Sequence, residues 1–229
     1  TYTFTASDFG FSDVDGDTLS SVTVSALSGS DGTFKLNGVA ITGSTSVTKT
    51  QIDSGLLTFV PDSNENGSSY NTFTFTVNDG TTDSASSYTM TVNVTAVNDA
   101  PTASNNTVTT NEDTTYTFTA SDFGFSDVDG DTLSSVTVSA LSGSDGTFKL
   151  NGVAITGSTS VTKTQIDSGL LTFVPDSNEN GSSYNTFTFT VNDGTTDSAS
   201  SYTMTVNVTA VNDAPTVVND TDSVTEGGT

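Results

Sequence analysis

Hydrophobic and polar residues alternate with a period of two in several short runs of the chain. The clearest runs are Tyr2-Phe4-Ala6, Phe73-Phe75-Val77 and Tyr88-Met90-Val92-Val94, each with Thr or Asn between the apolar positions. Because successive side chains of a strand point to opposite faces, this pattern predicts antiparallel strands with an apolar inner face and a wet outer face. Further strands are predicted around 22–24, 34–36, 57–59 and 105–110.

Turn residues separate these runs and define the fold class. Gly, Asp, Asn and Ser lie between the predicted strands, giving about seven short antiparallel strands per unit, and this pattern predicts an all-β fold of tandem β-sandwich domains. One helical turn is predicted at 48–51, because Thr48 and Gln51 form a capping box and Gly55 follows where a helix would end. We expect this turn to cross from one sheet to the other.

The same unit occurs twice. Residues 1–102 recur without a substitution as 115–216, which is a period of 114 residues. That length suits a self-contained domain better than a solenoid repeat. We expect a first repeat at 1–99 that lacks its first strand, a complete second repeat at 100–213, and a linker with the start of a third repeat at 214–229.

Composition narrows the possible partners. The chain has 27 acidic residues, four Lys, no His and no Cys, and its formal net charge is −23. Nucleic acids and anionic membrane surfaces are poor partners for such a chain, because binding them requires clustered basic residues. No apolar run reaches the length of a membrane-spanning helix, so we expect no membrane insertion in this fragment. Divalent cations are the natural partners.

The densest acidic cluster is Asp13-Val-Asp15-Gly-Asp17, repeated as Asp127, Asp129 and Asp131. Carboxylates at spacing one, three, five can converge on one hard cation, and the glycine allows the loop to turn around it. The twelfth position is Val24 where an EF-hand requires Glu, so an EF-hand is excluded. The alternative interpretation is a polar turn between strands.

Three further polar clusters lie near predicted strand ends. Each also has a purely structural interpretation: a turn that follows Pro61, an Asp-Gly hairpin turn, or a linker stiffened by proline. The clusters are 62–67 with Asp62 and Glu65, 78–80 with Asp79, and 97–101 with Asn98 and Asp99.

The order of these motifs resembles that of a cadherin repeat. The acidic Gly turn after Phe75, the last strand from Tyr88 and the Val-Asn-Asp-Ala-Pro101 linker resemble the end of such a repeat. Asp62 to Glu65 stands in the place of the Leu-Asp-Arg-Glu motif, Asp13-Val-Asp15 in that of the Asp-x-Asp loop, and Glu112 in that of the Glu that ends the first strand. The whole unit is also similar to the bacterial cadherin-like or tandem-95 (VCBS-like) repeats of giant RTX-type surface adhesins.

The resemblance implies an Ig-like or cadherin-like sandwich with Ca²⁺ at the junctions between repeats. Carried over by position, the ligands of the junction between the two repeats are Asp62 or Glu65, Asn98, Asp99, Asp127, Asp129 and Asp193, with Asp131 as an additional ligand. The equivalent or related positions are Asp13, Asp15, Asp17, Asp79 and Glu112.

These expectations favour a non-enzymatic function. The resemblance implies calcium-rigidified extender or spacer repeats of a bacterial adhesin, located at the cell surface or secreted by a type I system, that support cell adhesion or biofilm formation. An alternative is that the repeats themselves bind sugars or another copy. A remote alternative is a glycoside hydrolase that uses paired carboxylates, since the chain has no His or Cys.

The partners expected for each repeat are its neighbours in the chain. The first repeat is expected to have an open sheet edge where its first strand is missing. We hypothesise that residues 217–225 of another molecule fill this gap by strand exchange.

Overall fold

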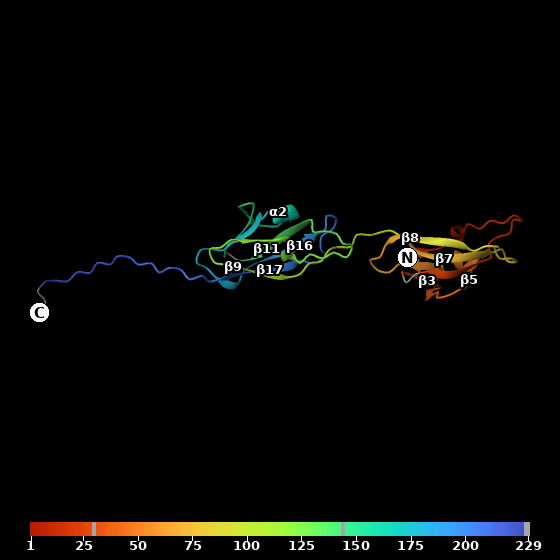
Figure 1. Cartoon of the computed structure of the whole chain (residues 1–229), viewed down its shortest axis with the longest axis horizontal. Helices are drawn as coiled ribbons and strands as arrows, with labels where there is room; N and C mark the ends of the chain where they lie inside the picture. The colour runs from red at the N-terminus through yellow and green to blue at the C-terminus, as the bar shows by residue number, and fades with distance from the viewer. Residues whose placement is uncertain (29–30, 143–144, 227–229) are drawn as a thin grey trace. The chain divides into compact units, whose positions relative to one another are not determined.

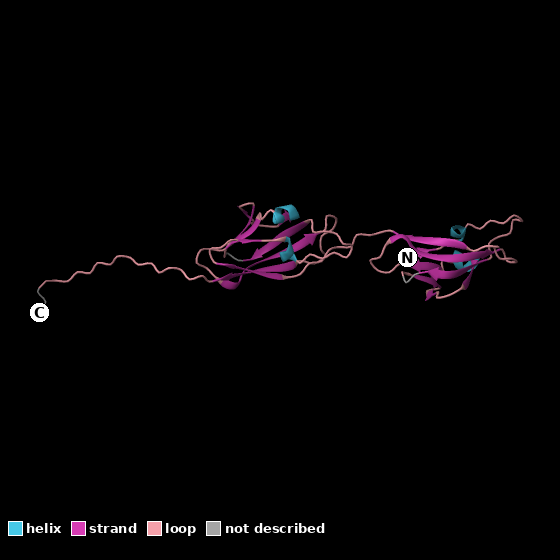
Figure 2. Cartoon of the chain, in the orientation of Figure 1, coloured by secondary structure: helices cyan, strands magenta, loops and turns pink. Residues whose placement is uncertain are grey.

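A computed structural model describes residues 1–28, 31–142 and 145–226. The chain forms two compact units, unit 1 (Thr1–Asn98) and unit 2 (Asp99–Thr229), each described by itself below (Figure 1). The regular secondary structure of both is mainly strand, with very short helices, and loops connect the strands (Figure 2). The predicted all-β, Ig-like sandwich class is confirmed.

Unit 1 contains two four-stranded sheets. One has the order β1-β6-β3-β4 and the other the order β5-β2-β7-β8, and all their pairs are antiparallel. The strands are β1 (Tyr2–Thr3), β2 (Ser21–Ser28), β3 (Thr33–Leu36), β4 (Val39–Ala40), β5 (Thr45–Thr48), β6 (Leu57–Val60), β7 (Gly67–Asn78) and β8 (Tyr88–Val94).

Unit 2 repeats this arrangement and adds one strand. Its sheets have the orders β10-β15-β12-β13 and β14-β11-β16-β17-β9. The strands are β9 (Asn106–Asn111), β10 (Tyr116–Thr117), β11 (Ser135–Ser142), β12 (Thr147–Leu150), β13 (Val153–Ala154), β14 (Thr159–Thr162), β15 (Leu171–Val174), β16 (Gly181–Asn192) and β17 (Tyr202–Thr209). The added strand β9, predicted at 105–110, runs parallel to β17 and is the exception to the antiparallel pattern.

Phenylalanine rings fill the interior between the two sheets. In unit 2, Phe148 of β12 and Phe187 of β16 come from different sheets, and their ring centroids lie 4.9 Å apart in an edge-to-face arrangement. Phe34 and Phe73 form the same contact in unit 1, also at 4.9 Å. The alternation seen in the sequence therefore places the Phe side chains inward, where edge-to-face pairs stabilise beyond their burial.

The predicted helical turn is confirmed as α1 (Lys49–Asp53) and its copy α2 (Lys163–Asp167). Thr48 N donates to Gln51 Oε1 over 2.9 Å, and Gln51 N donates to Thr48 Oγ1 over 3.2 Å, which is the reciprocal capping box. The helix connects β5 with β6, which belong to different sheets, as expected.

The first predicted strand is shorter than its alternation suggests. Only Tyr2–Thr3 form β1, whereas Ala6–Phe9 form a 3₁₀ helix. Thr5 N donates to Asp8 Oδ2 over 2.8 Å, so a local cap competes with the strand and turns the chain. Inclusion of Ala6 in a strand was therefore wrong.

The turn before β12 leaves no room for a side chain at Gly146. Its φ is +73°, and a Cβ there would lie 2.4 Å from Phe173 Cζ. We expect Gly146→Ala to lower the free energy of unfolding by about 2–4 kcal/mol, the sum of left-handed backbone strain and overpacking. Urea unfolding of the variant and of the wild-type chain measures this loss of stability. Gly157→Ala is the control, since nothing lies within 4 Å of its Cβ position; equal losses in both variants would contradict the prediction.

Candidate metal centre

Three aspartates of one loop of unit 2 come together. Asp127, Asp129 and Asp131 each offer a carboxylate oxygen, and these oxygens all lie within 4.8 Å of one another. Asp127 is half-buried, and the other two are exposed. We call residues 127–131 the aspartate loop. The convergence predicted from the spacing of the three residues is therefore present in this unit.

Hydrogen bonds within the aspartate loop shape its turn. Asp127 Oδ1 accepts from Asp129 N over 2.9 Å and from Asp131 N over 3.1 Å, so the backbone winds around one carboxylate. The other oxygen, Asp127 Oδ2, is buried and has no hydrogen-bond donor in the described part of the chain. A buried carboxylate oxygen without a donor is costly unless a cation accompanies it.

The segment that precedes β9 packs against the aspartate loop. Thr102 and Ser126 exchange two backbone hydrogen bonds of 2.8 and 2.9 Å. Asp99 N donates to Asp129 Oδ2 over 2.7 Å. Asp99 is thus brought to the predicted site by its backbone, from 30 residues away in the sequence.

No lysine neutralises this cluster within the described residues. The ion pairs found there join Lys49 to Asp53 and Lys163 to Asp167, four residues apart along the short helices. Two like charges 4.8 Å apart repel by about 0.9 kcal/mol even at the dielectric constant of water. The aspartate loop therefore has the donor set and the uncompensated charge that suit a hard divalent cation.

The identical loop in unit 1 is arranged differently. Asp13 Oδ1 accepts from Asp15 N over 2.8 Å and from Asp17 N over 3.1 Å, as in unit 2. The three carboxylates of this loop do not form a comparable cluster in the described residues. The local sequence is thus sufficient for the turn, and the convergence occurs where a preceding segment packs on the loop.

Asp79 and Asp193 close the turn between the last two strands. Asp193 Oδ1 accepts from the backbone N–H groups of Thr195 and Thr196, both over 2.6 Å, and Asp193 is not a member of the three-aspartate cluster. In unit 1, the N–H groups of Thr82 and Thr81 hold the pKa of Asp79 below its usual value. The hairpin-turn interpretation accounts for these contacts, and a metal role for either residue stays a prediction.

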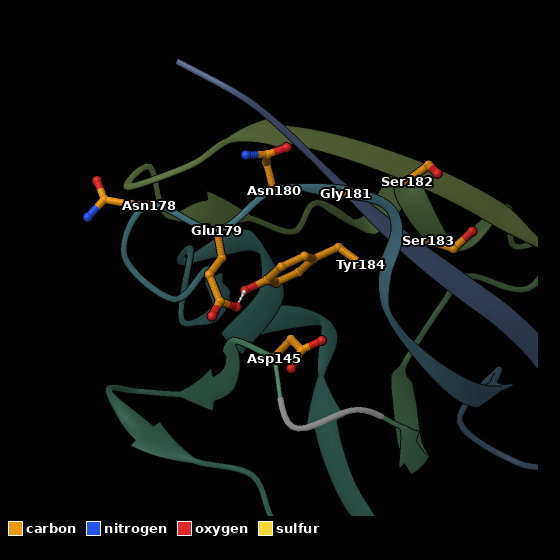
Figure 3. Close-up of a pocket in the computed structure, with 8 residues that line it drawn as sticks. All are labelled: Asp145, Asn178, Glu179, Asn180, Gly181, Ser182, Ser183 and Tyr184. Carbon is orange, nitrogen blue, oxygen red and sulfur yellow. Dashed lines mark hydrogen bonds between the residues drawn. The ribbon is translucent and has the colours of Figure 1, made fainter. Parts of the chain in front are cut away.

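The counterparts of Asp62 and Glu65 in unit 2 are Asp176 and Glu179, and neither belongs to the three-aspartate cluster. Figure 3 shows Glu179 with the residues around it. Tyr184 Oη donates to Glu179 Oε2 over 3.0 Å, and the two side chains point toward each other above Asp145. Burial, reinforced by this hydrogen bond, raises the pKa of Tyr184 to about 12. Residues 178–184 and Asp145 line an open depression of about 490 Å³.

The same contacts occur in unit 1. Tyr70 Oη donates to Glu65 Oε2 over 2.6 Å, and Asp62 Oδ2 accepts from Gly32 N over 3.0 Å. Tyr70 and Tyr184 were not among the predicted site residues, although each stands five residues after its Glu. Asn98 is the last residue of unit 1, and its predicted ligand role is untested.

Glu112 lies at the opposite end of β9 from the aspartate loop. It is only 5% exposed, and its Oε1 accepts a short hydrogen bond from Val211 N. Its Oε2 accepts from Asn180 Nδ2 over 3.5 Å. Glu112 therefore connects the end of β9 to the residues that follow β17, and it does not join Asp127, Asp129 and Asp131.

Comparisons with known proteins agree with this architecture. Residues 98–209 match the family model described as bacterial Ig domain, and residues 4–96 match the model described as cadherin-like. Because residues 1–102 and 115–216 are identical, the two descriptions apply to one and the same fold. No curated protein matches the chain.

Solved structures give only distant similarity. An endo-fucoidan hydrolase, MfFcnA4 from glycoside hydrolase family 107, is 21% identical with a TM-score of 0.31, over 86% of this chain and 24% of that one. A second, MfFcnA9, is 17% identical with a TM-score of 0.23, over 85% of this chain and 29% of that one. The chain thus spans about a quarter of the length of these proteins.

The fold and the acidic turns define a class, the antiparallel β-sandwich repeat. Within that class, the chain is a tandem of bacterial Ig-like and cadherin-like repeats. Domains of these families are typically non-enzymatic and are usually found outside the cell or at its surface. No helix in the described residues is long and apolar enough to cross a membrane.

The contacts of Glu112 predict a structural role that does not depend on metal. We expect Glu112→Ala to lower the free energy of unfolding by about 1–3 kcal/mol in EDTA, because the Val211 amide loses its acceptor. Glu112→Gln keeps an acceptor and should lose less. Urea unfolding and hydrogen exchange at the Val211 amide measure both. A loss that appears only when calcium is present would contradict this role and favour the ligand role.

Proposed function

We propose that the chain consists of calcium-binding extender repeats of a bacterial surface or secreted protein. The observation that carries this proposal is the convergence of the Asp127, Asp129 and Asp131 carboxylates, together with the buried Asp127 Oδ2, which has no hydrogen-bond donor among the described residues. Calcium accepts six to eight oxygen ligands in flexible geometry, so three carboxylates from one loop, completed by further protein oxygens and water, suit it.

Bound calcium would act on the loop and on the segment that lies against it. The ion would supply positive charge to the uncompensated oxygen of Asp127 and to the exposed carboxylates of Asp129 and Asp131. Asp129 also accepts from the Asp99 backbone, and Thr102 pairs with Ser126 next to the loop. Stabilising the aspartate loop therefore stabilises the position of residues 99–102, which lead into unit 2. Restricting this segment is our proposed mechanism of calcium-dependent rigidity.

The charge of the chain makes this mechanism useful. A tandem array that carries a formal charge of −23 in 229 residues repels itself. Extracellular modules bind calcium with dissociation constants of about 10⁻⁴ to 10⁻³ M, so the site would fill after export into millimolar calcium. In this proposal the stiffened repeats hold another region of an RTX-type, type I-exported adhesin away from the cell and so support adhesion or biofilm formation.

A spacer role fits the composition and the carboxylate positions of the chain better than an enzymatic role does. With no His and no Cys in the chain, carboxylates would have to supply the acid, base or nucleophile. The three clustered aspartates share one short loop, whereas the acid and the nucleophile of a glycoside hydrolase flank the scissile bond about 5–10 Å apart.

The identical loops of the two units provide a matched test. We expect the double variant Asp127→Asn/Asp129→Asn to lose most of the calcium-dependent rise in melting temperature. The matched double variant of unit 1, Asp13→Asn/Asp15→Asn, should keep most of that rise. Asn keeps an oxygen that accepts the loop hydrogen bonds, so the change acts mainly on cation binding. At 100 times the dissociation constant, one site adds about 2.7 kcal/mol, which corresponds to a shift on the order of 10 °C.

Calorimetric titration with calcium and small-angle scattering complete this test. We expect calcium to narrow the distribution of shapes of the wild-type chain, and Mg²⁺ at the same concentration to do so less, because it dehydrates reluctantly. The proposal is contradicted if the two double variants have equal effects, or if neither melting nor scattering responds to calcium. The acidic residues would then serve only to keep the surface soluble, and the repeats would be passive spacers.

A further inference from the structure

The first and the last strand of unit 2 lie side by side and run in the same direction. They are β9 and β17 (Figure 1). Six residue pairs in one register join them, from Asn106 opposite Met204 to Asn111 opposite Thr209. The chain enters unit 2 ahead of β9 and leaves it after β17. The points of entry and exit are therefore at opposite ends of one pair of strands.

This arrangement determines how unit 2 responds to tension along the chain. A pull on the preceding segment acts on the start of β9, and a pull on the following segment acts on the end of β17. The two forces are directed along the strands and oppose each other, so they shear the pair and strain its evenly spaced hydrogen bonds together. A pull that separates the starting ends of both strands opens the same bonds one after another, which requires less force.

Side chains add a contact at each end of this pair of strands. At the starting end, Thr203 N donates to Asn105 Oδ1 over 2.7 Å. At the far end, Val211 N donates a short hydrogen bond to Glu112 Oε1, and Glu112 N donates to Thr209 O over 2.9 Å. Glu112 is buried, so water has little access to this contact. The pair is thus closed at both ends by side chains of the segment that contains β9.

Core packing connects the two strands to the rest of unit 2. Val108 of β9 and Val206 of β17 both belong to its hydrophobic core. Asn106 Nδ2 donates to Asp122 O over 2.8 Å, in the 3₁₀ helix that follows β10. Because the interior is closely packed, sliding of β9 along β17 also disturbs these contacts. Tension on the two ends is therefore transmitted to the core.

We propose that β9 and β17 form a shear clamp that bears tension along the chain, with Asn105 and Glu112 as its end contacts. The clamp consists of strand pairing, two end hydrogen bonds and core packing, and none of these requires calcium. The load itself rests on the extender function proposed above, because a spacer that holds another region away from the cell transmits any pull on that region. The clamp gives each such repeat resistance to unfolding while it is under load.

Single-molecule pulling in two directions tests the clamp. The chain has no cysteine, so introduced cysteines at exposed positions attach the handles. Ala100→Cys/Asp213→Cys loads β9 and β17 in shear, and Ala100→Cys/Ser201→Cys pulls on the starting ends of both strands and peels them apart. The whole chain is used, and unit 1 lies outside the loaded segment. Measurement in EDTA separates the clamp from calcium binding, so either proposal can fail while the other stands.

We expect unit 2 to open at a several-fold higher force in shear than in peeling, at the same loading rate. Asn105→Ala should raise the rate of opening at constant force about fivefold in both directions, the effect of one hydrogen bond. Glu112→Ala should raise it about fivefold or more in shear only, because peeling starts at the other end of the strands. Thr107→Ala is the matched control, since this side chain of β9 is exposed between the two end contacts, and it should change neither rate.

Three results would overturn the proposal. The first is an equal opening force in the two directions of pulling, a comparison that needs no variant of the clamp itself. The second is a Glu112→Ala effect that is as large in peeling as in shear, which makes Glu112 a source of general stability only. The third is a Thr107→Ala effect as large as those of the two end variants, which means that the end contacts do not carry the load.

Discussion

Phenylalanine rings that meet between the two sheets hold each unit together. In unit 2, the ring centroid of Phe187 lies 4.9 Å from that of Phe148 and 5.6 Å from that of Phe118, and these three residues come from different strands or turns. The chain has no Trp and no Cys, so aromatic burial supplies much of what stabilises the fold. Only alternate positions of a strand reach this interior, and this restriction determines where every other residue type can stand.

No acidic residue of the described chain belongs to the hydrophobic core clusters, although Glu112 is buried beside them, and many of the acids stand in turns. There, the carboxylates that close a turn are also the groups that can bind a cation. Asp127 Oδ1 accepts two backbone N–H groups of its own loop, and one carboxylate oxygen of Asp127 lies within 4.8 Å of oxygens of Asp129 and Asp131. The turn and the segment that packs on it together organise the candidate site. The repulsion among the carboxylates is the part of the cost that a divalent cation would remove.

Identical segments adopt different environments in the two units, which separates local from long-range causes. The loops at 13–17 and 127–131 make the same internal hydrogen bonds, yet only the second forms a cluster of three carboxylates in the described residues. Likewise Val92 is 8% exposed while Val206 is fully buried, although their strands are the same. The difference lies in residues 99–111, which pack on the loop and pair with β17.

The sequence alone determined the strands, the repeat and the local turns, because each follows from residues close together along the chain. Period-two alternation placed Phe73 and Phe75 inward, and the Thr48–Gln51 capping box predicted α1. The spacing of Asp127, Asp129 and Asp131 predicted their convergence, but the same spacing at 13–17 forms no comparable cluster in the described residues, so the convergence also depends on tertiary contacts. Only the tertiary structure decided that Glu112 belongs to the other end of the unit, that Tyr184 holds Glu179, and that β9 runs parallel to β17. Contacts such as those of Asp99 with Asp129 and of Asn105 with Thr203 join residues 30 and 98 positions apart. No local pattern specifies them, because they depend on which strands become neighbours once the two sheets close around the phenylalanine core.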